Sequence, residues 1–156
     1  MTEGYTIRRA RPEDHPAVAR ELAEYLAYIG DSLEPDGLDH DIAHWQAEYD
    51  GRTGVLLVVL DAAGEVVGTA AVRVLEAGVG ELKRMWLRPA CQGQGLGRRL
   101  LDASLAEARS LGCRALRLDS QTKLAAAVGL YRANGFREIA PYNDNRRADI
   151  WMERTL

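Results

Sequence analysis

Residues 81–97 read ELKRMWLRPACQGQGLG, and this stretch passes from a strand-like segment into a glycine-rich loop. Glycines at three alternate positions allow a tight turn in which the backbone can come close to a ligand. A helical pattern of leucines follows, so the loop opens onto a helix N-terminus, whose free N–H groups and positive dipole end favour an anion. Arg88, Arg98 and Arg99 add positive charge around the loop. The stretch therefore predicts a site for a pyrophosphate-bearing ligand.

The segments before this loop predict a three-stranded antiparallel meander. A continuous apolar run at 55–60 is typical of a buried strand, and strands at 65–75 and 81–88 follow after short turns. Pro89 ends the third strand because proline cannot donate a hydrogen bond to the ladder.

The remaining elements follow from apolar periodicity and from turn residues. They are a strand at 6–10, a helix from Pro12 to Ile29, a helical stripe at 38–49, a helix at 96–111 closed by Gly112, a strand at 114–119, a helical stripe at 124–131 ended by Asn134, and strands at 136–140 and 149–155. This order predicts an α+β fold with about seven strands in a mixed, mostly antiparallel sheet, about four helices, and one βαβ crossover at the glycine-rich loop. With 156 residues, the chain is expected to form a single domain, residues 1–156.

Two other phosphate-binding loops compete with this interpretation. A P-loop requires Gly-Lys-Ser/Thr after its glycines, and the sequence contains none here. A dinucleotide-binding loop would be followed by a helix, a strand and then an acid, and Asp119 lies in about the right place. The glycine spacing is GxGxG rather than GxGxxG, and the preceding meander lacks repeated βαβ units. A nicotinamide-dependent oxidoreductase therefore stays a minor alternative.

The sequence resembles the GCN5-related N-acetyltransferase (GNAT) superfamily. The signature Gln/Arg-x-x-Gly-x-Gly/Ala of that family corresponds here to Gln92, Gly95 and Gly97. The strand ELKRMWLRP resembles its central strand, and the segment LYRANGF at 130–136 resembles its Leu-Tyr-x-x-x-Gly-Phe segment. Many members carry asparagine seven residues before the tyrosine, where this chain has Leu124, so one cofactor contact of the family is in question.

The resemblance implies acetyl-coenzyme A as the cofactor and direct attack of an amine on its thioester within a ternary complex. The implied catalytic residues are Tyr131, as acid or hydrogen-bond donor to the sulfur, and Glu81, as base acting directly or through water. A core position for Tyr131 and a strand-end ion pair of Glu81 with Arg73 or Lys83 are the competing structural interpretations. The implied cofactor-binding residues are Met85, Trp86, Leu87, Gln92, Gly93, Gln94, Gly95, Leu96, Gly97 and Arg98.

The acceptor is expected to be a primary amine of a small molecule or an amino acid. Arg73 and Lys83 lie on neighbouring predicted strands, where they could hold a carboxylate of the acceptor, although solvated strand charges are an equal alternative. Tyr25, Tyr28 and Tyr142 are candidates for the mouth of the acceptor site, although packing in the helix core is the favoured interpretation of Tyr25. No metal is expected, because His40 and His44, although spaced i, i+4, fall outside any HExxH motif.

Composition limits the other function classes. The net charge of −3 does not favour a nucleic-acid partner, and the apolar run at 55–60 is too short to cross a membrane. Two cysteines are too few for a disulfide framework, and the first residues lack the apolar core of a signal peptide, so a cytoplasmic location is expected. A homodimer is possible by the resemblance. A noncatalytic acyl-CoA-binding module stays the main alternative to an enzyme.

Overall fold

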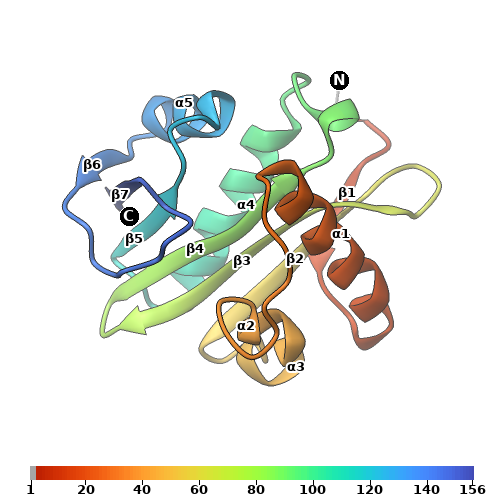
Figure 1. Ribbon diagram of the computed structural model, residues 1–156, viewed down its shortest axis with the longest axis horizontal. Coiled ribbons are helices and arrows are strands. Elements are labelled where there is room, and N and C mark those ends of the chain that lie inside the picture. The colour runs from red at the N-terminus through yellow and green to blue at the C-terminus, as the bar shows by residue number, and fades with distance from the viewer. Residues whose placement is uncertain (1–2) are drawn as a thin grey trace.

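The computed structural model describes residues 3–156, and these form one seven-stranded sheet in the order β1-β2-β3-β4-β5-β7-β6 (Figure 1). The strands are β1 (Thr6–Arg9), β2 (Gly54–Leu60), β3 (Val66–Glu76), β4 (Val79–Leu87), β5 (Ala115–Ser120), β6 (Arg137–Ile139) and β7 (Ile150–Thr155). The helices are α1 (His15–Tyr28), α2 (His40–Ala43), α3 (Trp45–Glu48), α4 (Leu96–Ser110) and α5 (Ala125–Ala133), with 3-10 turns at Pro12–Asp14 and Pro89–Cys91. The α+β fold predicted from the sequence is confirmed.

The predicted meander and the predicted crossover are both present, while the pairing of β1 with β2 and the position of β7 were not predicted. Strands β1 to β4 form an antiparallel meander, and α4 then carries the chain across the sheet so that β5 pairs with β4 in parallel. Strand β7 inserts between β5 and β6, antiparallel to both. The one parallel pair therefore lies directly after the glycine-rich loop, as the predicted βαβ crossover requires.

The apolar run of β2 is explained by a core on each face of the sheet. Val55, Leu57 and Val59 belong to the core that includes α4, whereas Leu56 and Val58 belong to the core that includes α1 to α3. Figure 1 shows α4 behind the sheet and α1, α2 and α3 in front of it. Because successive side chains of a strand point to opposite faces, a strand covered on both faces has no polar position.

The single helical stripe predicted at 38–49 is divided in the structure. It forms two short turns, α2 and α3, and His44 between them has φ −122° and ψ 33°, outside the helical region. The stripe residues Ile42, Trp45 and Tyr49 are nevertheless buried. Long-range hydrogen bonds act on this segment, including one donated by Trp45 Nε1 to His15 Nδ1 at 2.7 Å. Tertiary contacts therefore override the local helical pattern.

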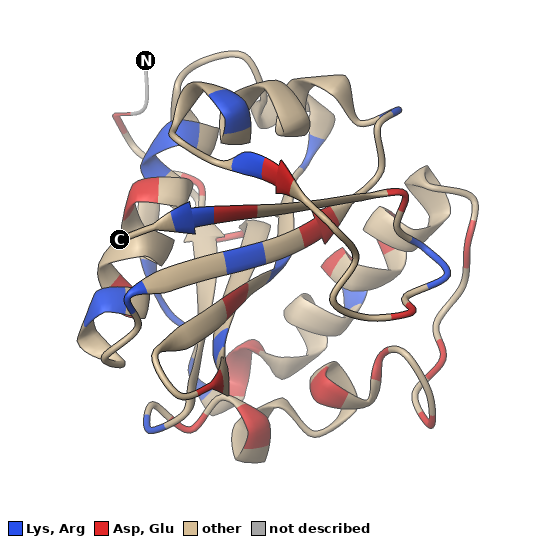
Figure 2. Cartoon of the chain, turned by 90° about the vertical axis from the view of Figure 1, so that its left-hand side faces the viewer, with Lys and Arg blue, Asp and Glu red and all other residues tan. Residues whose placement is uncertain are grey.

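The far end of the sheet carries charges of both signs. Figure 2 shows basic and acidic residues interspersed along β5, β6 and β7. Glu153 on β7 accepts a hydrogen bond from Arg117 Nε at 2.8 Å and from Arg137 at 3.4 Å, so these charges are paired across strands. Within residues 3–156, none of the helices combines the length and the apolar character that a membrane crossing needs.

Candidate active site

The site is built around the divergence of β4 and β5. These strands pair only from Val79–Ala115 to Glu81–Arg117, although β4 continues to Leu87. Past the last pair, neither strand provides backbone partners for the other, so the N–H and C=O groups that face the opening are available to a ligand. An extended ligand can lie along β4 in this opening, as an added strand would.

A β-bulge in β4 lies beside this opening. Lys83 pairs with Ala71 and Trp86 pairs with Thr69, so β4 has one more residue than β3 between the two pairs. Arg84 in the bulge has φ 58°, the only positive φ of a non-glycine residue among those that the structure describes. A bulge bends its strand and re-aims its side chains, and Thr69 Oγ1 fixes this one by donating to the Arg84 carbonyl at 2.7 Å.

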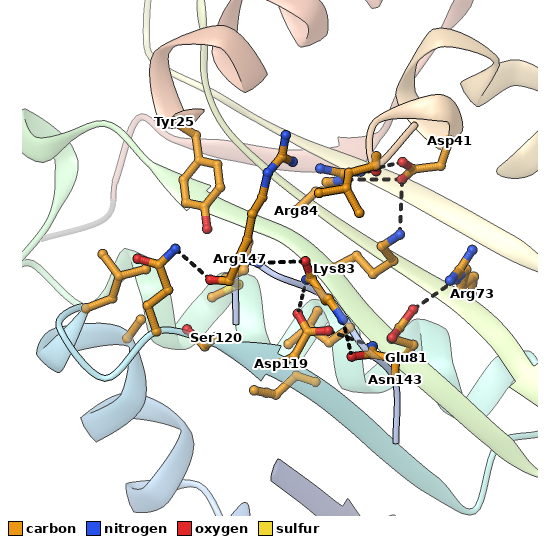
Figure 3. Close-up of a pocket in the computed structure, with 18 of the residues that line it drawn as sticks. Tyr25, Asp41, Arg73, Glu81, Lys83, Arg84, Asp119, Ser120, Asn143 and Arg147 are labelled. Atoms are coloured by element: carbon orange, nitrogen blue, oxygen red, sulfur yellow. Dashed lines mark hydrogen bonds and ion pairs between the residues drawn. The ribbon is translucent and has the colours of Figure 1, made fainter. Parts of the chain in front are cut away.

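A cavity of about 400 Å³ lies at the opening (Figure 3). Its wall includes Glu81, Lys83 and Met85 from β4, Asp119 from β5 and Tyr131 from α5. The predicted acid, the predicted base and one predicted cofactor residue thus share one cavity.

Glu81 is buried, with 4% of the residue exposed, and both of its carboxylate oxygens are engaged. Oε1 accepts a hydrogen bond from Arg73 Nε at 3.0 Å, and Oε2 accepts one from the Tyr142 hydroxyl at 2.7 Å. Burial, followed by the charge of Glu81, raises the pKa of Tyr142 well above its usual range, so this tyrosine stays protonated and donates. The ion pair with Arg73 that the sequence offered as the competing interpretation is present, in a residue that also lines the cavity.

Tyr131 is buried, with 4% exposed, and its ring packs edge-on against Phe136 at 5.7 Å between centroids. It belongs to the core and lines the cavity at the same time, so the two interpretations of this residue are compatible. Burial raises the pKa of its hydroxyl above the usual range, with smaller contributions from Tyr25 and Asp119. The phenol is therefore suited to donating a hydrogen bond rather than to releasing its proton.

An ion-pair network that the sequence analysis did not identify closes one side of the cavity. The bulged Arg84 donates to Asp39, to Asp41 and to the carbonyl of Leu38, and Arg147 donates to Asp39. Figure 3 shows the Lys83 side chain reaching toward Asp41, at 3.7 Å between Nζ and Oδ2. These partners are 42 to 108 residues apart in the sequence, and no local sequence pattern signals such contacts.

The glycine-rich loop has the geometry of an anion-binding turn. Gly93 and Gly95 have φ of 78° and 82°, and Gly95 is the N-cap of α4. The Gln92 side chain ties the loop to β4 by donating to the Leu87 carbonyl at 2.8 Å. The first backbone bond of the helix runs from the Arg99 amide to the Gly95 carbonyl at 3.2 Å, so the preceding helical amides have no acceptor within the helix. These features fit a pyrophosphate, the group that acetyl-CoA, the cofactor expected from the sequence, would place there.

Two of the arginines that were expected to add positive charge around the loop form ion pairs with carboxylates in the structure. Arg88 donates to the fully buried Glu21 at 2.9 and 2.6 Å, so its charge is neutralised on the α1 side of the sheet. Arg98 is exposed and pairs with Asp102 at 3.4 Å. The main-chain amides, rather than Arg88, are the positive element of the loop.

The other predicted site residues are more dispersed. Trp86 is buried against the rings of Tyr25 and Tyr28, with centroids at 5.6 Å in each case, and Leu87 is buried too, so their side chains belong to the core. Tyr28 is 59% exposed and does not line this cavity, whereas Tyr25 does. The rings of His40 and His44 lie 4.4 Å apart between centroids at an interplanar angle of 40°, and no cluster with the composition of a metal site occurs within residues 3–156.

Comparison with known proteins shows the family of this chain. The model of the acetyltransferase (GNAT) family matches residues 9–136. An "IAA acetyltransferase" of Azospirillum brasilense is 34% identical over 88% of this chain and 87% of its own length, and an "L-methionine sulfoximine/L-methionine sulfone acetyltransferase" of Pseudomonas paraeruginosa is 36% identical over 84% and 79%.

A solved structure extends the likeness to the fold. A GNAT superfamily phosphinothricin acetyltransferase from Sinorhizobium meliloti in complex with AcCoA superposes with a TM-score of 0.77 at 21% identity, covering 98% of this chain and 89% of that one. Sequence, site geometry and fold agree, and the chain belongs to the GNAT family of acetyl-CoA-dependent N-acetyltransferases.

Proposed function

We propose that this enzyme transfers the acetyl group to a primary amine of a small molecule or an amino acid, by direct attack within a ternary complex. The observation that carries the proposal is the cavity at the divergence of β4 and β5, where Glu81 and Tyr131 line one space. A relative that is named for acetylating amino-acid analogues supports an acceptor of this class.

The acceptor must lose a proton before it can attack. An amine with a pKa of about 10.4 is neutral in only about one part in a few thousand at pH 7, so deprotonation costs roughly 4–5 kcal/mol. We assign this step to Glu81, which receives the proton through water because Arg73 and Tyr142 already occupy one site on each carboxylate oxygen. Tyr142 and Arg73 thereby act as positioning residues for the base.

Bound acetyl-CoA supplies a thioester, in which the new C–N bond forms as the C–S bond breaks. The main-chain N–H of Met85, on the open edge of β4, is the proposed donor to the developing oxyanion, and Leu87 would hold the pantetheine arm through its backbone. Tyr131 is the proposed hydrogen-bond donor to the sulfur. A thiol has a pKa of about 8.5 and tyrosine about 10, so complete proton transfer would be uphill by about 2 kcal/mol even without the upward shift that burial causes.

The cellular setting is part of the proposal. Cys91 and Cys113 are both free and buried, which fits a reducing compartment, and we place the enzyme in the cytoplasm. A homodimer stays a prediction that sedimentation of the purified protein would test.

The experiment that tests the function is a screen of small amines with acetyl-CoA, read by release of free thiol and by the mass of the acetylated product. Amine-dependent thiol release is the expected result. Saturable binding of acetyl-CoA in calorimetry without turnover of any amine would favour the noncatalytic acyl-CoA-binding module instead. Binding of NADH in the parallel titration would favour the oxidoreductase.

A further inference from the structure

Two opposite charges face the opening from its two sides. Glu81 and Arg117 form the last pair of β4 and β5. Side chains alternate along a strand, so the next residues on the same face are Lys83 and Asp119. They would stand opposite each other if the pairing continued, but the strands diverge there. Both line the cavity, and no ion pair joins them among the residues that the structure describes.

Asp119 has neutral partners only. One carboxylate oxygen accepts a hydrogen bond from Asn143 Nδ2 at 2.8 Å, and the other accepts one from Asn145 Nδ2 at 3.2 Å (Figure 3 shows the first). Within residues 3–156, no lysine, arginine or histidine lies at ion-pair distance from it. The two amides fix the carboxylate without neutralising it, and a carboxylate with about four acceptor sites retains capacity for further donors.

Lys83 is also incompletely paired. Its Nζ lies 3.7 Å from Asp41 Oδ2, beyond hydrogen-bond distance. Asp41 is already engaged by Arg84 and by the Tyr49 hydroxyl, which donates to it at 2.5 Å. The ammonium of Lys83 therefore has donors available to an anion in the cavity, where 22% of its side chain is exposed.

The wall beside Asp119 is aromatic. Tyr25 and Tyr131 both line the cavity, and after burial the charge of Asp119 is among the causes that raise the pKa of each hydroxyl, so the carboxylate lies within electrostatic reach of both. An anion next to aromatic rings is a favourable environment for an ammonium group, which gains from the charge and from the ring faces.

We propose that Asp119 binds the ammonium group of the acceptor and that Lys83 binds a carboxylate of the same molecule, so that the preferred acceptor is a small zwitterion of the α-amino-acid class. The inference rests on the proposed function and specifies its acceptor. The zwitterion supplies an ammonium for Asp119, which has neutral partners only, and a carboxylate for Lys83, whose ion pair with Asp41 is beyond hydrogen-bond distance. Arg73, which the sequence analysis paired with Lys83, is held by Glu81 instead.

The test compares amino acids with their carboxamides, which keep the amine and lose the negative charge. Each common amino acid and its carboxamide is titrated into the complex of the enzyme with coenzyme A, and each is also assayed for acetylation. At least one amino acid should bind about 10-fold or more tightly than its carboxamide, since a charge-assisted hydrogen bond to Lys83 is lost in the latter.

Two variants distinguish binding of the acceptor's carboxylate from binding of its ammonium group. Lys83→Met should weaken binding of that amino acid by about 10- to 100-fold and change binding of its carboxamide by less than about 3-fold. Asp119→Asn should weaken both ligands by about 10- to 100-fold, because both carry the ammonium. Asp144→Asn removes the same charge from an exposed residue of the same cavity wall and serves as the matched control, with a change below about 3-fold.

A third variant tests whether Asp119 acts only by holding the 141–148 segment in place. Asn145→Ala removes one tether of the 141–148 segment and keeps the carboxylate. The inference is overturned if Asn145→Ala weakens binding of the amino acid as much as Asp119→Asn does. It is also overturned if carboxamides bind as tightly as amino acids. Acetylation of amines that lack a carboxylate, with no amino acid accepted, overturns this inference alone, whereas no turnover of any amine overturns the proposed function as well.

Discussion

The hydroxyl of Tyr131 is the group that we assign to the departing sulfur, and removing it is the direct test of that role. Phenylalanine keeps the packing against Phe136 but cannot donate. Tyr131→Phe should lower kcat by about 10- to 100-fold, toward the low end of general-acid effects because the raised pKa limits proton transfer. The dissociation constant of acetyl-CoA should change by less than about 2-fold. Steady-state kinetics and calorimetry measure the two quantities, and an unchanged kcat would remove Tyr131 from the mechanism.

Glu81 accepts hydrogen bonds from Arg73 and Tyr142. These bonds fix the position of its carboxylate, and they can also contribute to the stability of the fold. Glu81→Gln retains an oxygen that can accept from Arg73 or Tyr142 and loses the capacity to take a proton. We expect kcat to fall by about 100-fold, with KM of the acceptor changed far less. The same variant should keep its affinity for acetyl-CoA. Equal losses in kcat and in acetyl-CoA binding would mean that Glu81 serves the fold rather than proton transfer.

The positions of Tyr131 and Glu81 in the fold could be predicted from the residues around them, whereas their roles come from the family resemblance and stay predictions. Tyr131 belongs to a helical stripe and Glu81 begins a strand that leads into the glycine-rich loop. Arg84 and Asp41 could not be predicted, since their role depends on a bulge in β4 and on a contact 43 residues away. The partners of Asp119 likewise come from a segment whose path over the cavity no local pattern specifies.

Helix α2 is held against β4 by the buried ion pair of Asp41 with Arg84, which makes its docking sensitive to acid. Burial acts to raise the pKa of Asp41, but the hydrogen bonds and charge of Arg84 outweigh it and lower the pKa from 3.8 to about 2. A carboxyl with a lower pKa in the folded state stabilises the protein fully above pH 4 and loses that contribution as the pH falls toward 2. The contribution is about 2 kcal/mol at neutral pH.

Unfolding in urea between pH 2 and 7 measures this effect. Asp41→Asn should be less stable than the natural protein at pH 7 by about 3–5 kcal/mol, since Arg84 loses a buried partner. That difference should shrink by about 2 kcal/mol as the pH approaches 2. Asp144→Asn, at an exposed position, should show no comparable pH dependence. A difference for Asp41→Asn that stays constant over the whole range would contradict the ion-pair account.

The elements themselves differ in how far they could be predicted. The buried strand β2 and the amphipathic helix α4 could be predicted, because the apolar run of β2 and the apolar stripe of α4 are long and continuous. The segment 38–49 has a helical stripe as well, yet its burial is achieved by two separate turns. A short stripe fixes which side chains are buried, whereas contacts from other elements decide the backbone path between them.

The main feature of the whole molecule is that β4 and β5 pair at one end and separate at the other. The glycine-rich loop and the helix after it predict a crossover that brings β5 beside β4, so this part of the topology could be predicted. How far the two strands pair could not, because no local pattern signals that the pairing stops at Glu81–Arg117 or that β4 has a bulge beyond it. The cavity exists because the sheet is incomplete at that point, which also explains why polar groups are concentrated there.

A ligand that occupies this opening should stabilise the entire fold, since it supplies partners that the sheet lacks. At a concentration of acetyl-CoA about 100 times its dissociation constant, the added stability is about 2.7 kcal/mol, and Tm should rise by about 5–10 °C for a chain of this size. Gly95→Asp introduces a side chain at φ 82° and a negative charge where the pyrophosphate is expected, so its Tm should be lower without ligand and nearly unchanged by acetyl-CoA. Differential scanning fluorimetry with NADH as the control ligand measures both. A full shift in Gly95→Asp would show that the pyrophosphate binds elsewhere, and a shift with NADH alone would contradict the acetyl-CoA site itself.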